Sequence, residues 1–143
     1  MSFVVGVDPS SHRHGIAIYR AGKLEELTTW MLVDVIGWLE KQEIKPRFSI
    51  ENVMANNFVY SRNNQKTKQA QAKVGLSIGR CQQSQVELMR VLDHLEIPYQ
   101  LIKPTRDNWA NDKAMFERYT GWTGRSNKDT RSASYFGFLA ARG

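Results

Sequence analysis

The chain has little cysteine, no long apolar run and no pattern of a secretory leader. Its 143 residues include a single cysteine, Cys81, which excludes an internal disulfide and is typical of a reducing compartment. No stretch approaches the ~18 consecutive apolar residues of a membrane-spanning helix. The first residues lack the basic, apolar and small-residue segments of a signal peptide. We therefore expect a cytoplasmic protein with no membrane partner.

Positive charge, by contrast, is in excess. The chain has 20 Lys and Arg against 14 Asp and Glu, which gives a net charge of +6. Its length suits one domain, residues 1–143, because domains typically contain ~100–150 residues. A basic domain favours a polyanionic partner, although composition alone does not separate nucleic acid from an anionic membrane.

Acidic residues are missing from one long stretch, because none occurs between Glu51 and Glu87. Cations interleaved with amides and aromatics are typical of surfaces that contact phosphates and bases. A membrane-surface helix would need a bulky apolar face, which residues 56–72 lack, so the remaining alternative is a solvated polar loop. We expect DNA contacts here and in a second basic group near the end of the chain. The expected DNA-binding residues are Phe58, Tyr60, Arg62, Lys66, Lys68, Lys73, Arg80, Arg125, Lys128 and Arg131.

Hydrophobic periodicity and turn residues divide the chain into alternating elements. The expected strands are residues 3–7, 15–19, 24–30, 47–51 and 98–102. The expected helices are residues 32–44, 66–96, 104–120 and 127–142. Three strands followed by alternating helices and strands predict an α/β fold, with a mixed sheet covered by helices.

The longest expected helix has one apolar stripe and two small residues. The stripe consists of Val74, Ile78, Cys81, Leu88, Leu92 and Leu95. It places Cys81 as a small core residue rather than as a nucleophile. Gly75 and Gly79 are four residues apart on this helix, which allows close approach of a second helix and predicts a symmetric dimer.

Three acidic residues stand where catalytic groups often lie. Asp8 ends the first strand, Glu51 ends the strand after the first helix, and Asp129 opens the last helix. Each has a simpler explanation as a turn residue, a solvent-facing strand end or a helix-start residue. Acids at neighbouring strand ends would repel unless a cation lay between them, and hard oxygen ligands suit Mg²⁺ or Mn²⁺. Together they predict a metal site.

The order of three motifs carries a family resemblance over essentially the whole chain. Residues 5–10 (VGVDPS) precede a hairpin that starts at residues 15–17 (GIA), residues 49–53 read SIENV, and residues 120–133 contain the last acid. This arrangement resembles the RuvC-type Holliday junction resolvases of the RNase H-like superfamily, in their bacteriophage-like form. The resemblance implies an RNase H-like mixed five-stranded sheet flanked by helices.

The resemblance also implies an activity. It is that of a homodimeric crossover junction endonuclease of DNA recombination and repair, in a bacterial or phage-infected cell. Such an enzyme nicks two strands of like polarity at a four-way junction, with Mg²⁺ as cofactor and Mn²⁺ as a substitute. Asp8, Glu51 and Asp129 are then the catalytic metal ligands. Lys113 matches a lysine near the scissile phosphate, although a solvated helix lysine is an equal alternative.

Two further positions are read from the resemblance. Phe58 or Tyr60 corresponds to an aromatic that wedges into the junction. Ser132 stands where the family often has a metal-ligating acid. Either Ser132 assists Asp129 through a water molecule, or the chain is a catalytically weakened or inactive junction-binding protein. A third alternative is another RNase H-like nuclease that acts on RNA–DNA hybrids or replication forks.

Overall fold

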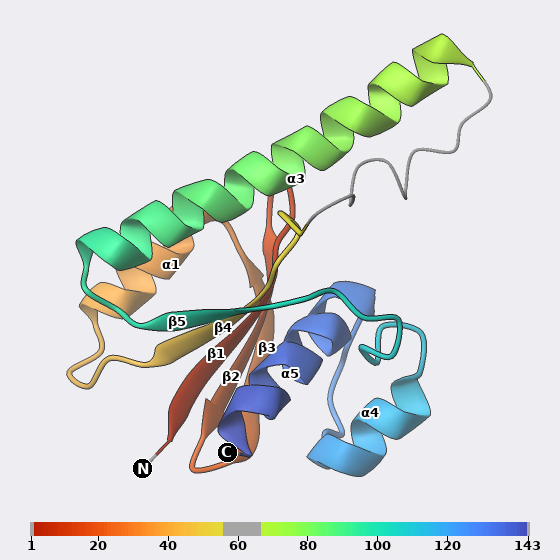
Figure 1. The fold of residues 1–143 in the computed structure, drawn as a ribbon. Coiled ribbons are helices and arrows are strands. Elements are labelled where there is room, and N and C mark those ends of the chain that lie inside the picture. Colours follow the sequence, from red (N-terminus) through yellow and green to blue (C-terminus); the bar gives the residue numbers. More distant parts are fainter. Residues whose placement is uncertain (1, 56–66, 143) are drawn as a thin grey trace.

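The computed structural model describes residues 2–55 and 67–142, in which five strands form one sheet. The strand order is β3-β2-β1-β4-β5 (Figure 1). β1, β2 and β3 are antiparallel neighbours, whereas β4 and β5 run parallel to β1. The strands are β1 (Phe3–Asp8), β2 (His14–Arg20), β3 (Lys23–Trp30), β4 (Arg47–Glu51) and β5 (Tyr99–Ile102). The predicted mixed five-stranded sheet is confirmed.

Helices cover both faces of this sheet. The helices of the described residues are α1 (Leu32–Glu40), α3 (Lys68–His94), α4 (Lys113–Thr120) and α5 (Lys128–Ala141). α1 and α3 lie on one face, and α5 and α4 lie on the other (Figure 1). Among the described helices, none is both long and apolar enough to cross a bilayer.

Alternation along the strands assigns each side chain to one of the two faces. On β1, Val5 and Val7 belong to the apolar cluster beneath α1 and α3, whereas Val4 belongs to the cluster beneath α5. Each large apolar side chain buried in this way contributes about 1.5–3 kcal/mol to stability. On β4, the Ser49 hydroxyl donates to the Phe136 carbonyl of α5 at 2.7 Å. The odd-numbered positions of β4 therefore face α5.

α5 lies unusually close to β1 because glycines meet there. A Cβ atom at Gly6 would lie 2.6 Å from the backbone nitrogen of Gly137. Beside this contact, the buried Tyr19 hydroxyl donates to the Ser134 carbonyl at 2.8 Å. These contacts hold the helix at a defined height above the sheet, and they thereby set where its first turn lies.

The first helix is shorter than the expected range of 32–44. α1 ends at Glu40, because the Lys45 ammonium donates to the carbonyls of Leu39 and Gln42, both at 2.6 Å. The Leu39 carbonyl belongs to the last turn of α1 and the Gln42 carbonyl follows the helix, so Lys45 stabilises this helix end ahead of the proline that the sequence suggests as the terminator.

The expectation of a helix from residue 104 is wrong for its first half. Trp109 has a φ of 66°, a left-handed conformation that a helix does not tolerate. The Asn108 side-chain oxygen accepts from the Ala110 backbone nitrogen at 3.1 Å, which is a local turn that competes with helix formation. α4 begins only at Lys113, where the Asp112 carboxylate caps the first turn.

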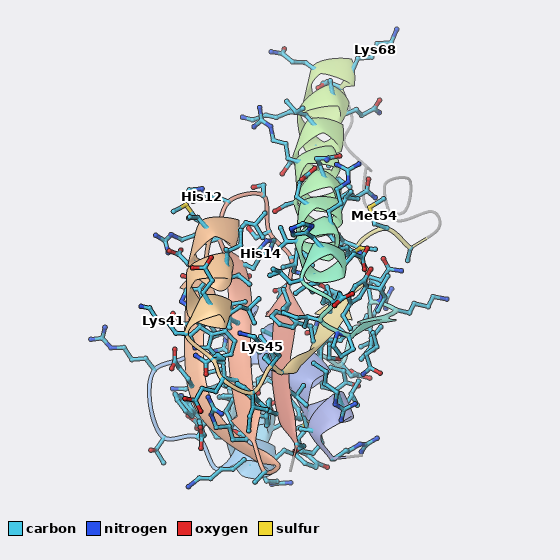
Figure 2. The ribbon with its side chains drawn as sticks, turned by 90° about the vertical axis from the view of Figure 1, so that its left-hand side faces the viewer. His12, His14, Lys41, Lys45, Met54 and Lys68 are labelled. Atoms are coloured by element: carbon cyan, nitrogen blue, oxygen red, sulfur yellow. The ribbon has the colours of Figure 1, made fainter. Side chains whose placement is uncertain are left out.

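The long helix α3 projects beyond the sheet. Its buried residues begin at Ile78, so its first ten residues extend past the strands, with Lys68 at the far end (Figures 1 and 2). Gly79 is exposed, and a Cβ atom there would meet nothing within 4 Å. The predicted stripe is correct at Leu88 and Leu92 but wrong at Leu95, which is 40% exposed.

Candidate active site

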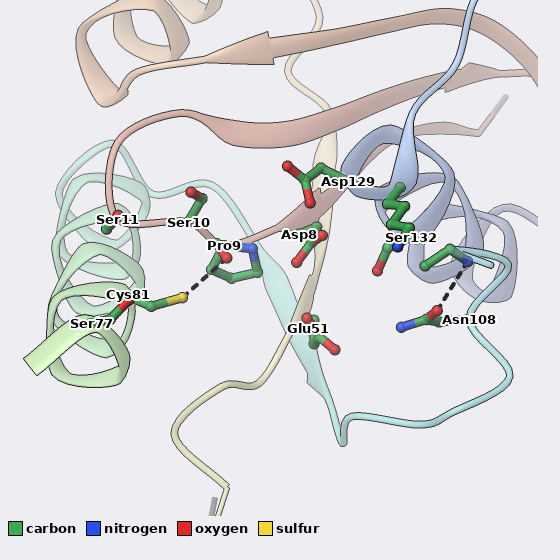
Figure 3. A pocket seen from close by; sticks show the side chains of 12 residues that line it. Asp8, Pro9, Ser10, Ser11, Glu51, Ser77, Cys81, Asn108, Asp129 and Ser132 are labelled. Carbon is green, nitrogen blue, oxygen red and sulfur yellow. Dashed lines mark hydrogen bonds between the residues drawn. The ribbon is translucent and has the colours of Figure 1, made fainter. Parts of the chain in front are cut away.

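A pocket of about 320 Å³ lies where β1 and β4 end and α5 begins (Figure 3). Asp8, Glu51, Asp129 and Ser132 all line it. The structure therefore places the three acids expected as metal ligands, and Ser132 as the residue expected to assist them at the metal, around one cavity; their roles at a metal stay a prediction.

Strand register explains why the first two acids are neighbours. β1 and β4 pair in parallel through Val7 and Ile50, so Asp8 and Glu51 are the next residues of the two strands. Their side chains point to the same face as Ser49, which is the face that α5 covers. Glu51 is only 7% exposed, so its carboxylate lies largely out of contact with bulk water.

The third acid comes from the first turn of α5. The Asn127 side chain accepts from the Thr130 backbone nitrogen at 2.9 Å and starts the helix, which leaves Asp129 in that turn. A Cβ atom at Gly15 of β2 would lie 2.8 Å from the Asp129 carbonyl carbon. Only glycine at this position lets the sheet approach the backbone of Asp129. Ser132, one turn later, is 3% exposed.

Of the two lysines that begin α4 and α5, only one lines the pocket. Lys128, expected as a DNA contact, lines the pocket beside Asp129. Lys113 does not line it; its ammonium lies 3.9 Å from the Glu117 carboxylate, and its side chain is 61% exposed. The catalytic role of Lys113 stays a prediction, and Lys128 is a second candidate that sequence reasoning missed. The sequence signal that could have indicated a role for Lys128 at the site is its position directly before Asp129.

The other expected DNA contacts lie in different settings. Lys68, Lys73 and Arg80 are exposed on α3, and Arg125 is exposed before α5. The Arg131 guanidinium is instead engaged within the protein. Its Nη2 donates to the Ala110 carbonyl at 2.9 Å, and its Nη1 donates to the Ser126 hydroxyl at 2.9 Å. Phe58, Tyr60, Arg62 and Lys66 lie outside the described residues.

Several residues that line the pocket were not predicted as site residues from the sequence. Ser10, Ser77 and Asn108 add hydroxyl or amide oxygens to its wall. Cys81 was expected in the core, but it is half-buried and lines the pocket. Its thiol donates to the Pro9 carbonyl at 3.1 Å. Cys81 continues the apolar stripe of the helix, but at this point the helix packs against the loop after β1 rather than against the core.

The donor set of the pocket fits a hard divalent cation. Carboxylate, hydroxyl and amide oxygens are the ligands that Mg²⁺ and Mn²⁺ prefer. Within residues 2–55 and 67–142, no three His, Cys, Asp or Glu side chains are grouped closely enough to hold one ion. Mg²⁺ does not require such a group, because it keeps several waters and typically takes one or two carboxylates. Asp8 with Glu51, and Asp8 with Asp129, are the pairs that would hold it.

A buried histidine contacts the wall of the pocket, because His14 Nδ1 accepts from the backbone nitrogen of Ser10, which lines it. His14 is 1% exposed, and its burial lowers its pKa to about 4 from 6.5. The unfolded chain therefore binds a proton between pH 6.5 and 4 that the folded chain does not. We expect the free energy of unfolding to be about 3 kcal/mol lower at pH 4 than at pH 7, because one pKa unit corresponds to about 1.4 kcal/mol.

Urea unfolding of the wild type and of His14→Gln at a series of pH values measures this effect. The variant should lose most of the dependence between pH 6.5 and 4. His12→Gln, which replaces an exposed histidine two residues away, is the matched control and should keep the wild-type slope. Equal slopes for the wild type and His14→Gln would contradict the expectation.

Comparison with known proteins gives matches at the level of structure. No family model and no curated protein matches the chain in sequence. The structure of T. thermophilus RuvC in complex with a Holliday junction substrate matches 99% of this chain and 96% of its own, with a TM-score of 0.61 and 11% identity. A second Thermus thermophilus RuvC structure matches 97% of this chain and 93% of its own, with a TM-score of 0.54 and 13% identity. The chain thus has the RuvC form of the RNase H-like fold.

Proposed function

We propose that this chain is a structure-selective DNA endonuclease that resolves four-way junctions with the aid of Mg²⁺ or Mn²⁺. The observation that carries the proposal is the convergence of Asp8, Glu51 and Asp129, from three separate elements, on one pocket of a RuvC fold. The RuvC structure with a Holliday junction substrate supports branched DNA as the partner. The proposed setting is recombination or repair in the cytoplasm of a bacterial or phage-infected cell.

Charge around the pocket suits a phosphodiester substrate. When bound, a divalent cation supplies positive charge to the reacting phosphate and acidifies an attacking water. Lys128 lines the pocket, so its ammonium can hold a phosphate oxygen beside the acids. The exposed cations of α3 extend away from the pocket, where they can bind a neighbouring arm of the DNA.

A homodimer is part of the proposal. Each chain offers one set of the three acids, whereas symmetric resolution requires two nicks, so two copies are needed for each junction. The exposed Gly79, which lies just after the projecting first ten residues of α3, supports close approach of a second helix there. Sedimentation at micromolar concentration, with and without junction DNA, tests this part, and a monomer in both cases would exclude it.

A substrate panel tests the activity. Synthetic four-way junction, replication fork, linear duplex and RNA–DNA hybrid are each incubated with the chain in Mg²⁺, in Mn²⁺ and without metal. We expect paired nicks that ligase can seal, on the junction alone and only with metal. Faster cutting of the hybrid or the fork would mean that this substrate, and not the four-way junction, is the one on which the chain acts.

Ser132 favours a second candidate function, a junction-binding protein that does not cut. The serine is 3% exposed and lines the pocket next to Asp129, where an acid would add a further charge for cation binding. Under this alternative, the chain binds the junction in Ca²⁺ and yields no product in Mg²⁺ or Mn²⁺. The same panel therefore separates the two functions.

A further inference from the structure

Polar side chains occupy the middle of α3 where it crosses the ends of β1 and β4. Gln85 is 0% exposed, and Cys81, Gln82 and Ser84 are half-buried. A fully buried amide is unfavourable unless its donors and acceptors are paired. Leu88, about one turn further along α3, is apolar and packs in the core, so burial on this helix does not by itself require a polar side chain. The partners of these polar groups therefore indicate what the helix does here.

Two of the amides hold the loop that follows the second acid, residues 52–55, here named loop B. The Gln85 side-chain oxygen accepts from the Val53 backbone nitrogen at 2.8 Å, and its nitrogen donates to the Asn52 side-chain oxygen at 3.0 Å. The Gln82 side-chain nitrogen donates to the Val53 carbonyl at 3.0 Å. Both polar groups of the Val53 backbone are thus bonded to α3, two residues after Glu51.

The same stretch of α3 holds the loop that follows the first acid, residues 9–11, here named loop A. The Cys81 thiol donates to the Pro9 carbonyl at 3.1 Å. The His14 Nδ1 atom accepts from the Ser10 backbone nitrogen at 3.1 Å, and its Nε2 atom lies 3.4 Å from the Ser84 hydroxyl. Since Nδ1 accepts, Nε2 carries the proton and the serine oxygen receives it.

We propose that the middle of α3 acts as a clamp that fixes the spacing of Asp8 and Glu51 for divalent cation binding, with Gln85 and Cys81 as positioning residues. The inference rests on the proposed function. Hydrogen bonds, unlike apolar contacts, hold the backbone of a loop at a defined distance and direction. Residues that orient metal ligands without touching the metal typically change its affinity about 10- to 100-fold when they are lost.

Mn²⁺ binding, followed by the electron paramagnetic resonance signal of free Mn²⁺, tests the clamp without any measurement of cleavage. We expect Gln85→Met and Cys81→Ala to weaken binding about 10-fold. Cys81→Ser keeps a donor for the Pro9 carbonyl and should bind within about twofold of the wild type. Gln82→Met, which removes one bond of a half-buried side chain, provides a milder variant should Gln85→Met fail to fold.

Leu88→Val is the matched control for general loss of stability. It shortens a fully buried apolar residue on the same helix, so it should lower the melting temperature of the metal-free protein and leave Mn²⁺ affinity unchanged. The clamp is overturned if the polar variants bind Mn²⁺ as the wild type does, if Leu88→Val weakens binding equally, or if the wild type binds no Mn²⁺. Mn²⁺ binding that follows the expected pattern, in a wild type that leaves junctions uncut, would instead exclude the proposed function and keep the clamp.

Discussion

Asp8→Asn is expected to lower junction cleavage about 10³-fold, the upper range for loss of a single preorganised electrostatic group. Asp8 is the last residue of the central strand, and it lines the same pocket as Glu51 and Asp129. It is the acid common to both proposed cation-binding pairs, so its loss weakens both. Asparagine has nearly the same shape, so the fold should persist.

Single-turnover cleavage of a four-way junction in Mg²⁺ measures the effect. Junction affinity in Ca²⁺ is measured in parallel and should change little, because the cations that hold DNA remain. Asp34→Asn is the matched control: that side chain accepts from the Met31 backbone nitrogen at the start of α1, and an amide oxygen can do the same. Wild-type cleavage rates in Asp8→Asn would show that the assigned site is wrong.

Gly6→Ala is expected to destabilise the protein by more than about 3 kcal/mol, beyond the usual range for an overpacked core. The new Cβ atom would lie 2.6 Å from the nitrogen and 2.8 Å from the Cα atom of Gly137. These are backbone atoms of α5, so relief requires the whole helix to move away from β1. Because α5 carries Asp129 and Ser132, such movement would also open the candidate site.

Thermal unfolding followed by circular dichroism checks this prediction, with an expected fall in melting temperature of roughly 10 °C. Gly37→Ala is the control, since a Cβ atom there meets nothing within 4 Å. Gly37 lies inside α1, where alanine should add about 0.5–1 kcal/mol of stability. A Gly6→Ala variant that melts with the wild type would mean that α5 does not pack against β1 at this distance.

Local pattern was sufficient to predict the strands and the ranges of α3 and α5 to within about two residues, because alternation and helical spacing are properties of neighbouring residues. These patterns failed where a side-chain hydrogen bond to the backbone ended a helix or prevented one from forming. Lys45 ends α1 early, and the turn at Asn108 prevents a helix over residues 104–112. Neither interaction has a spacing signature strong enough to outweigh the periodicity on either side.

Some features of the candidate site were likewise predictable from the sequence, and others were not. The positions of Asp8 and Glu51 at strand ends were predictable, since each follows an apolar run and precedes a turn. The different settings of Lys113 and Lys128 were not, because both lysines open a helix and only packing brings one of them to the pocket. Arg131 shows the same limit, since its partner Ala110 is 21 residues away in the chain.

Sequence alone established the charge, the order of the acid-bearing elements and the placement of Asp8 and Glu51 at strand ends; the register of β1 with β4 then puts both acids on the face that α5 covers. The packing of distant elements decided the rest: α5 brings Asp129 to that face through the contact of Gly6 with Gly137, and α3 joins both loops through Cys81 and Gln85. The physical reason is that periodicity records which side of an element is buried, whereas the identity of the partner depends on contacts between residues far apart in the chain.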